Sequence, residues 1–142
     1  MLVRCLYASR ATQPLGEQVL DKILAQSRRH NPARGITGML CFADGIFVQV
    51  IEGGREEVCK LLATIMGDDR NHDVQLLSYE EISERTFGNW TMGQVNMTTI
   101  NPALLLKYSK RAVLDPFSCG GAATMALLHE IAAVGAIVNR AS

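Results

Sequence analysis

The chain has 142 residues, the size of a single domain that buries its own core without disulfides or metal. Hydrophobic residues make up 48% of it, and 14 Lys and Arg balance 14 Asp and Glu, so the net charge is zero. This balance leaves no basic field for phosphate backbones and argues against nucleic acid as a direct partner. The N-terminus lacks the layout of a signal peptide and charged residues interrupt the apolar runs, so we expect a cytoplasmic protein without a membrane span.

Cysteines are widely spaced along the chain, with no Cys-x-x-Cys motif and no cysteine and histidine cluster at metal-ligand spacing. We therefore expect ordinary buried thiols at Cys5, Cys41, Cys59 and Cys119. The sequence contains no internal repeat or low-complexity tract, and no linker divides it before about residue 98.

The first elements follow from apolar periodicity. Alternation predicts a strand over residues 2–8. Apolar residues then recur at helical spacing from Thr12, a plausible cap, to about His30. Asn31-Pro32 is expected to end this helix, because the residue before proline is pushed out of the helical region. A second strand is predicted over residues 35–42.

Asp44-Gly45 is a two-residue hairpin signal, so the strand that follows it should pair antiparallel with the strand before it. That third strand carries Gln49 and breaks at Gly53-Gly54. Apolar residues at i, i+3, i+4 and i+7 predict a second helix that begins near Val58 and ends at Gly67. Two further strands are expected over residues 74–81 and 92–97.

This βαββαββ order, with right-handed crossovers, predicts an α+β protein with a ferredoxin-like sheet, mainly antiparallel, and both helices on one face. The first and third strands then lie side by side in the centre. Tyr7 and Gln49 are expected to be neighbours under the two helices.

The composition changes after residue 98, and we divide the chain into a domain at 1–98 and a C-terminal helical extension at 99–142. The extension predicts helices over residues 102–106 and 122–140, separated by Pro116 and Gly120-Gly121. We expect these helices to cover the other apolar face of the sheet, and a dimer or partner contact is the second interpretation. The apolar stripe of the longer helix consists of Leu127, Leu128, Ile131, Val134 and Val138.

Gln49 stands out because it is a polar amide inside a strand that is apolar on both faces. A buried amide costs a few kcal/mol unless its oxygen and nitrogen are both hydrogen-bonded, by backbone, by water or by a ligand. On the predicted fold, polar side chains converge on the helix-covered face around a slot with aliphatic walls. Such a slot suits a flat heteroaromatic ring with imide-type edges. The side chains are Tyr7, Ser9, Ser27, His30, Asn31, Gln49, Asp68 and Arg70, with Ile23 and Ile65 in the walls.

Several motifs in register resemble the BLUF domain, a blue-light sensor that uses flavin. The resemblance covers residues 2 to about 97 and implies the ferredoxin-like fold. The matching motifs are Leu6-Tyr7-x-Ser9, Ser27-x-x-His30-Asn31, Gly35-Ile36-Thr37-Gly38, Phe47-Val48-Gln49-x-Ile51-Glu52-Gly53, Asp68-x-Arg70 and Asn89-Trp90-Thr91-Met92.

The resemblance implies a noncovalent flavin, FAD with FMN as the alternative, between the two helices. Ile23 and Ile65 would sandwich the ring, with Asn31 at its pyrimidine edge and Arg70 and His30 assisting. Ser27 belongs to the same set of cofactor contacts, and Asp68 would orient Arg70 or the ribityl chain. Gln49 would bridge Tyr7 and the N5/O4 edge of the flavin.

The implied mechanism is photochemical. Blue light makes the flavin a strong oxidant, Tyr7 donates an electron, and a proton passes through Gln49. The Gln49 amide is left rotated or tautomerised, its bond to flavin O4 strengthens, and absorption shifts to the red. Met92 would relay this state into the fifth strand and the tail. Trp90 either competes as an electron donor, swings in and out of the pocket, or is a rim aromatic that seals it.

One departure from the family pattern is the run Asp68-Asp69-Arg70-Asn71-His72, where the family often has histidine directly after the arginine. Either Asn71 or His72 could take over that contact. We expect no catalysis by this chain and a homo-oligomer that signals to a separate effector, such as a cyclic-dinucleotide phosphodiesterase or a transcriptional regulator. The alternatives are a light-independent flavin-binding regulator and an acylphosphatase-type enzyme, which would need a glycine-containing anion loop after the first strand.

Overall fold

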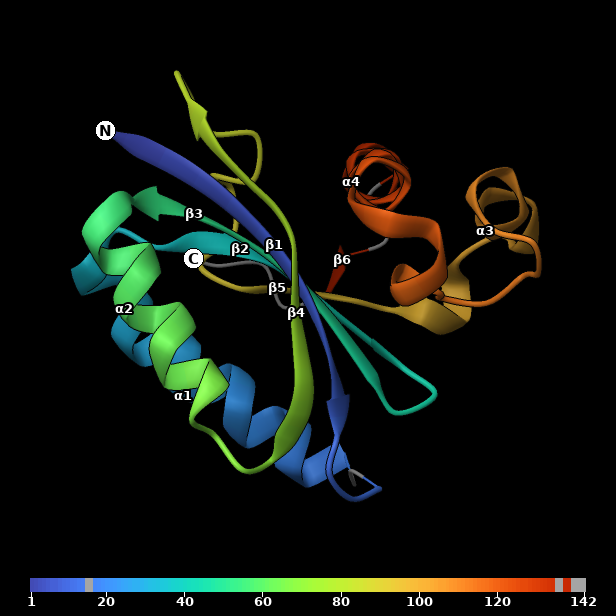
Figure 1. Cartoon of the computed structure of the whole chain (residues 1–142), viewed down its shortest axis with the longest axis horizontal. Helices are drawn as coiled ribbons and strands as arrows, with labels where there is room; N and C mark the ends of the chain where they lie inside the picture. The colour runs from blue at the N-terminus through green and yellow to red at the C-terminus, as the bar shows by residue number, and fades with distance from the viewer. Residues whose placement is uncertain (15–16, 135–136, 139–142) are drawn as a thin grey trace.

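The computed structural model describes residues 1–14, 17–134 and 137–138. Within them a mixed sheet has helices on both faces (Figure 1). The elements are β1 (Leu2–Ala11), α1 (Glu17–Arg34), β2 (Thr37–Ala43), β3 (Ile46–Gly54), α2 (Arg55–Met66), β4 (Asn71–Ile82), β5 (Gly93–Val95), the 3-10 turn η1 (Met97–Thr99), α3 (Pro102–Tyr108), α4 (Pro116–Val134) and β6 (Ile137–Val138).

The sheet has the order β4-β1-β3-β2-β5-β6. Its first four strands are antiparallel and have the ferredoxin-like order, while β5 pairs parallel with β2. The predicted α+β fold is therefore confirmed. In the register of the central pair, Tyr7 lies directly opposite Gln49, as the sequence predicted.

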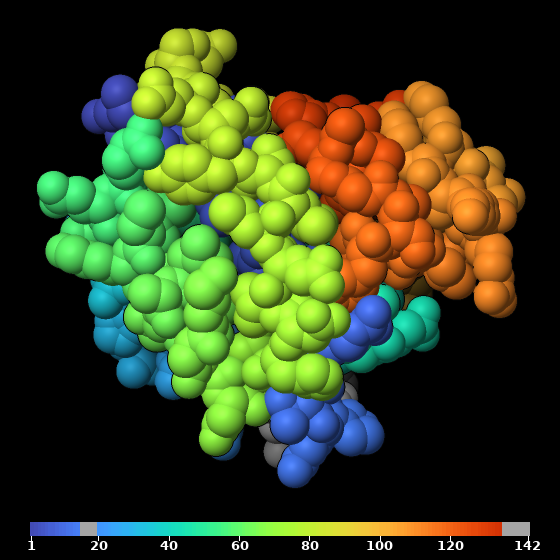
Figure 2. Space-filling model, in the orientation of Figure 1, coloured from blue at the N-terminus to red at the C-terminus, as the bar shows by residue number. Residues whose placement is uncertain are grey.

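The two faces of the sheet carry different layers (Figure 1). Helices α1 and α2 cover one face, where odd-numbered residues of β1 and β3 such as Cys5, Tyr7 and Ile51 pack. The predicted helical cover on the other face is also confirmed. There, even-numbered residues such as Leu6 and Val48 pack with apolar residues of α3 and α4. Figure 2 shows β4 at the surface between α2 and the tail.

The sequence predicted that helix α1 ends at Asn31-Pro32. In the structure the helix continues to Arg34. The end is set by Gly35, whose φ of 66° lies in the left-handed region that favours glycine. The backbone N–H of Gly35 donates to the Pro32 carbonyl at 3.2 Å, and that of Ile36 donates to the Asn31 carbonyl at 2.9 Å. This Schellman-type closure outweighs the disfavoured position before proline, because Pro32 costs the helix only one backbone bond near its end.

The tail differs from its prediction in three ways. Helix α4 begins at Pro116 rather than 122, because two helical pieces join across a kink at Gly120, with φ 79° and ψ −177°. The predicted end at residue 140 is wrong, since residues 137–138 form β6 beside β5. Val134, predicted in the buried stripe, is 67% exposed, whereas Leu127, Leu128 and Ile131 are buried. Residues 135–136 and 139–140 of the predicted helix, and residues 15–16 near the start of α1, lie outside the described residues.

Helix α4 is long and apolar enough to cross a membrane by length and composition alone. It lies against the sheet, and Gly121 makes the closest approach. A Cβ at this position would lie 2.3 Å from the Leu77 carbonyl oxygen of β4. The expectation of buried thiols holds for Cys5 and Cys41. It is wrong for Cys59, which is exposed on α2, and Cys119 is only half-buried.

A buried carboxylate holds the segment 83–92, which joins β4 to β5, through hydrogen bonds to its backbone. Glu52 of β3 is fully buried and accepts from Arg4 Nε at 2.8 Å and from the backbone N–H groups of Thr86 at 3.0 Å and Phe87 at 2.5 Å. Arg85 adds bonds to the Gly35 carbonyl and the Thr37 hydroxyl, both at 2.7 Å. Charge-assisted bonds of this kind hold an otherwise irregular segment in place.

Candidate functional site

A cavity of about 350 Å³ opens between α1 and α2 above the sheet. This volume lies within the usual range of small-molecule pockets, roughly 300–1,000 Å³. Tyr7 and every residue predicted to contact a cofactor line it, so chain segments far apart in the sequence converge as expected. These residues are Tyr7, Ile23, Ser27, His30, Asn31, Gln49, Ile65, Asp68 and Arg70.

Gln49 has hydrogen-bond partners on both ends of its amide. Tyr7 Oη donates to Gln49 Oε1, and Gln49 Nε2 donates to Met92 Sδ at 3.1 Å. Gln49 is only 6% exposed and Tyr7 only 5% exposed, so water does not satisfy these groups. The amide identified from the sequence as needing a partner is therefore held between a phenol and a thioether.

Burial raises the pKa of the Tyr7 phenol above its usual value, with smaller contributions from Cys5 and Asp68. The phenol consequently stays neutral at physiological pH and remains a hydrogen-bond donor. A neutral phenol that loses an electron becomes strongly acidic. Gln49 Oε1, which already accepts the bond from this hydroxyl, is the group placed to receive the proton.

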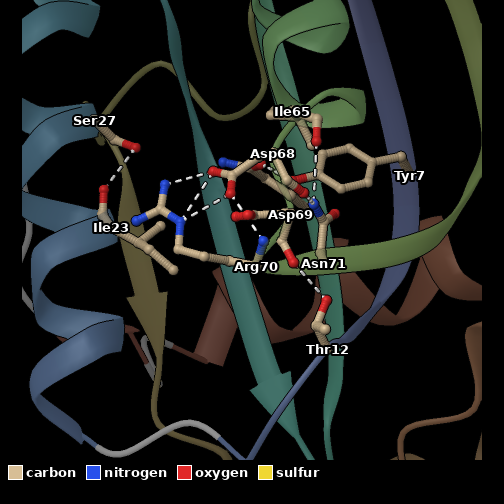
Figure 3. A network of polar contacts seen from close by, with 10 residues as sticks. Tyr7, Thr12, Ile23, Ser27, Ile65, Asp68, Asp69, Arg70 and Asn71 are labelled. Carbon is tan, nitrogen blue, oxygen red and sulfur yellow. Dashed lines mark hydrogen bonds and ion pairs between the residues drawn. The ribbon is translucent and has the colours of Figure 1, made fainter.

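Asp68 and Arg70 form a tight ion pair in the space between the helices (Figure 3). Arg70 Nε lies 3.0 Å from both carboxylate oxygens, and the backbone N–H of Arg70 donates to Asp68 Oδ1 at 3.0 Å. The hydrogen bond from Arg70 lowers the pKa of Asp68. Asp68 thus orients the guanidinium at the cavity wall, which is one of the two roles expected for it.

Asn71 lines the cavity, whereas His72 does not. The structure therefore favours Asn71 over His72 as the residue that takes over the contact of the histidine common in the family. The Asn71 amide donates to the Ile65 carbonyl at 3.0 Å and the Asp68 carbonyl at 2.7 Å. These bonds tie the last turn of α2 to the start of β4 (Figure 3).

Trp90 and Met92 fall on different sides of the sheet. Met92 is fully buried and packs with Leu40 and Phe47 on the cavity side. Trp90 packs in the core cluster under α4 and is not part of the cavity lining. A rim aromatic that seals the pocket does not match this position, which is the outer of the two positions expected for Trp90. Its role as an electron donor stays a prediction.

Several residues of the cavity lining were not among the predicted cofactor contacts. Ser9 is fully buried in the lining, and its hydroxyl has no partner among the described residues. The sequence placed it among the polar side chains around the slot, two residues after Tyr7 on the same strand face, but assigned it no cofactor contact. Arg34 also lines the cavity, and it was missed because α1 was predicted to end at Asn31.

The chemistry of this cavity fits a flavin. Its walls carry aliphatic side chains, including Ile23 and Ile65, that suit a flat ring. Asn31 and Gln49 supply amides for an edge that has both donors and acceptors. The buried hydroxyl of Ser9, which lacks a partner, adds one more polar group facing the same volume.

Comparison with known proteins agrees with this chemistry. The model of the family BLUF, described as sensors of blue-light using FAD, matches residues 2–93. The chain belongs to the BLUF family. As a BLUF protein it is a flavin-binding blue-light sensor, and the acylphosphatase alternative is not favoured.

Among solved structures, this BLUF chain is similar to "BlsA photo-activated state", with 29% identity, a TM-score of 0.81 and coverage of 92% of this chain and 94% of that one. It is also similar to "BlrB - a BLUF protein, dark state structure", with 32% identity, a TM-score of 0.77 and coverage of 94% and 96%. A curated relative, the photoactivated adenylate cyclase subunit beta of Euglena gracilis, is 34% identical over 92 residues. That match spans 64% of this chain but only 11% of the relative.

Proposed function

We propose that this BLUF protein senses blue light through the relay Tyr7, Gln49 and Met92, and that it passes the signal through its C-terminal extension to a separate protein. One observation carries the proposal. The Gln49 amide has a donor at its oxygen and an acceptor at its nitrogen, so its orientation is defined by its neighbours. A group oriented in this way can store a signal by reversing its bonds.

The residues act in sequence. A bound flavin supplies a blue-light absorber that becomes a strong oxidant on excitation. Tyr7 is the electron donor, because it is the neutral phenol that lines the cavity and is bonded to Gln49. Its proton moves to Gln49 Oε1 along the existing hydrogen bond. The electron and a proton then return to the Tyr7 radical, so no net oxidation remains. The amide is left rotated or tautomerised, which breaks its bond to Met92 Sδ and changes the position of segment 90–92.

The cavity residues predicted as cofactor contacts would hold the flavin. Ile23 and Ile65 would contact the faces of the ring, and Asn31 would bond its polar edge. Arg70, oriented by Asp68, and His30 and Ser27 complete the contacts. FAD is the cofactor that the family description names, and FMN would occupy the same ring site.

The output is assigned to a partner. The domain at residues 1–98 detects light, and the extension at 99–142 contacts either a second copy of the chain or an effector. An effector of cyclic-nucleotide metabolism is supported by a BLUF-containing relative, "Klebsiella pneumoniae BlrP1 pH 9.0 manganese/cy-diGMP complex", which is 29% identical to this chain and covered over 26% of its length. A transcriptional regulator stays the alternative, and a cytoplasmic location stays a prediction.

The visible spectrum of the flavin-loaded protein tests the proposal. In the dark and after blue light, the wild type should show a reversible red shift. Gln49→Leu should bind flavin but lose the shift, because leucine has neither donor nor acceptor. Gln26→Leu is the matched control, since it removes an amide from the cavity wall outside the relay and should keep the shift. A full shift in Gln49→Leu would contradict the role of Gln49.

A further inference from the structure

Segment 90–92 is held by three consecutive backbone carbonyls, each bonded to a different residue. The Gly38 N–H donates to the Trp90 carbonyl at 3.0 Å. Asn31 Nδ2 donates to the Thr91 carbonyl at 3.3 Å, and an Arg28 guanidinium nitrogen donates to the Met92 carbonyl at 3.3 Å. The segment lies outside the regular strands and helices, so these bonds fix its position.

Arg28 differs from the other two donors. It follows Ser27 on α1 but does not line the cavity, so it belongs neither to the cofactor contacts nor to the sheet. Its Nε is buried and has no partner among the described residues. The unpaired nitrogen of this half-buried guanidinium costs free energy of folding. The hydrogen bond to the Met92 carbonyl compensates for that cost.

The position of Met92 matters for the state of Gln49. A thioether sulfur accepts hydrogen bonds and cannot donate them, so Met92 Sδ favours the amide orientation that presents Nε2 to it. If the amide turns, Oε1 faces the sulfur and two acceptors meet. The less Met92 can retreat from the turned amide, the more this arrangement is disfavoured and the sooner the amide returns.

We propose that Arg28 is a positioning residue that holds Met92 against Gln49 and thereby sets how fast the light-adapted state reverts in the dark. The inference rests on the proposed rearrangement of Gln49. When Arg28 is replaced, Met92 withdraws from the turned amide, the light-adapted state is less disfavoured, and its reversion slows.

The test is the rate at which the red-shifted spectrum decays in darkness, measured on the full flavin-loaded chain. Arg28→Met keeps the aliphatic stem but removes the donor, and it should slow recovery about fivefold, in line with the loss of part of one charge-assisted hydrogen bond. Arg28→Lys restores a charged donor and should bring the rate back toward that of the wild type. Arg29→Met is the matched control, because it removes the same charge from an exposed neighbouring position on α1 and should not change recovery.

A double variant keeps the inference falsifiable if Arg28→Met alters the fold. Met92→Leu removes the sulfur, so adding Arg28→Met to it should slow recovery no further. Wild-type recovery in Arg28→Met, equal slowing in Arg29→Met, or loss of flavin in Arg28→Met would each overturn the inference. Absence of any red shift in the wild type would instead refute the proposed function, so the two failures are distinguishable.

Discussion

Glu52 offers the sharpest test of what holds segment 83–92 under the tail. Its carboxylate is fully buried, three residues after Gln49 on β3, and accepts from Arg4, Thr86 and Phe87. Glu52→Gln keeps the size of the side chain but removes the charge. Arg4, itself only 8% exposed, then loses its buried counter-ion.

Breaking a buried ion pair from one side costs about 3–5 kcal/mol. Arg4 retains Glu80, at 2.9 Å, as a second carboxylate partner, so we expect the lower end, about 3 kcal/mol. The matched control is Glu81→Gln. It removes a carboxylate that is 61% exposed and paired with Arg55 at the surface, where such pairs contribute about 1 kcal/mol or less.

Urea unfolding followed by far-UV circular dichroism and by tryptophan fluorescence measures both free energies of unfolding. Trp90 is the single tryptophan, and it is buried within the segment that Glu52 anchors. If Glu52→Gln were no more destabilising than Glu81→Gln, the carboxylate would not be the anchor we infer. The double variant Arg4→Met with Glu52→Leu should recover part of the loss, since no unpaired charge remains buried.

Three further outcomes are expected. Ser9→Ala should weaken flavin binding about three- to tenfold in a fluorescence titration, without destabilising the apoprotein, because the buried hydroxyl has no partner among the described residues. Gly121→Ala should cost about 1–3 kcal/mol in thermal unfolding, since its Cβ would lie 2.3 Å from a β4 carbonyl oxygen, whereas Gly54→Ala has open space. The hydrogen bond from Arg70 lowers the pKa of Asp68, so this pair stabilises the fold above about pH 4. The stabilisation is lost as the pH falls through the lowered pKa. Asp68→Asn should remove this pH dependence from unfolding curves.

The predictable part of the site is the part carried by regular strands. The two-residue period of β1 and β3 decides which side chains share a face, so Tyr7 and Gln49 could be placed together from the sequence. The positions of Asp68 and Arg70 could also be predicted, because both residues directly follow a helix whose end at Gly67 was clear from the sequence.

The less predictable part depends on irregular backbone. No period runs through segment 83–92, so the sequence could not show that Trp90 and Met92 face opposite sides of the sheet. The end of α1 was misplaced because the rule for the residue before proline competes with the closure at Gly35, and the closure prevails here. The contact between Arg28 and Met92 depends on both the end of α1 and the course of segment 83–92, so it could not be predicted from the sequence.

The separation of Trp90 from Met92 suggests how a change in the cavity reaches the tail. Met92 bonds Gln49 on one side of the sheet, and two residues earlier Trp90 packs in the cluster that contains Leu127 and Ile131 of α4. The indole N–H of Trp90 has no partner among the described residues, so packing and the backbone bond from Gly38 hold the residue. A shift of Met92 therefore moves Trp90 without breaking a hydrogen bond of its side chain. Because the core under α4 is close-packed, the helix has to adjust to that movement.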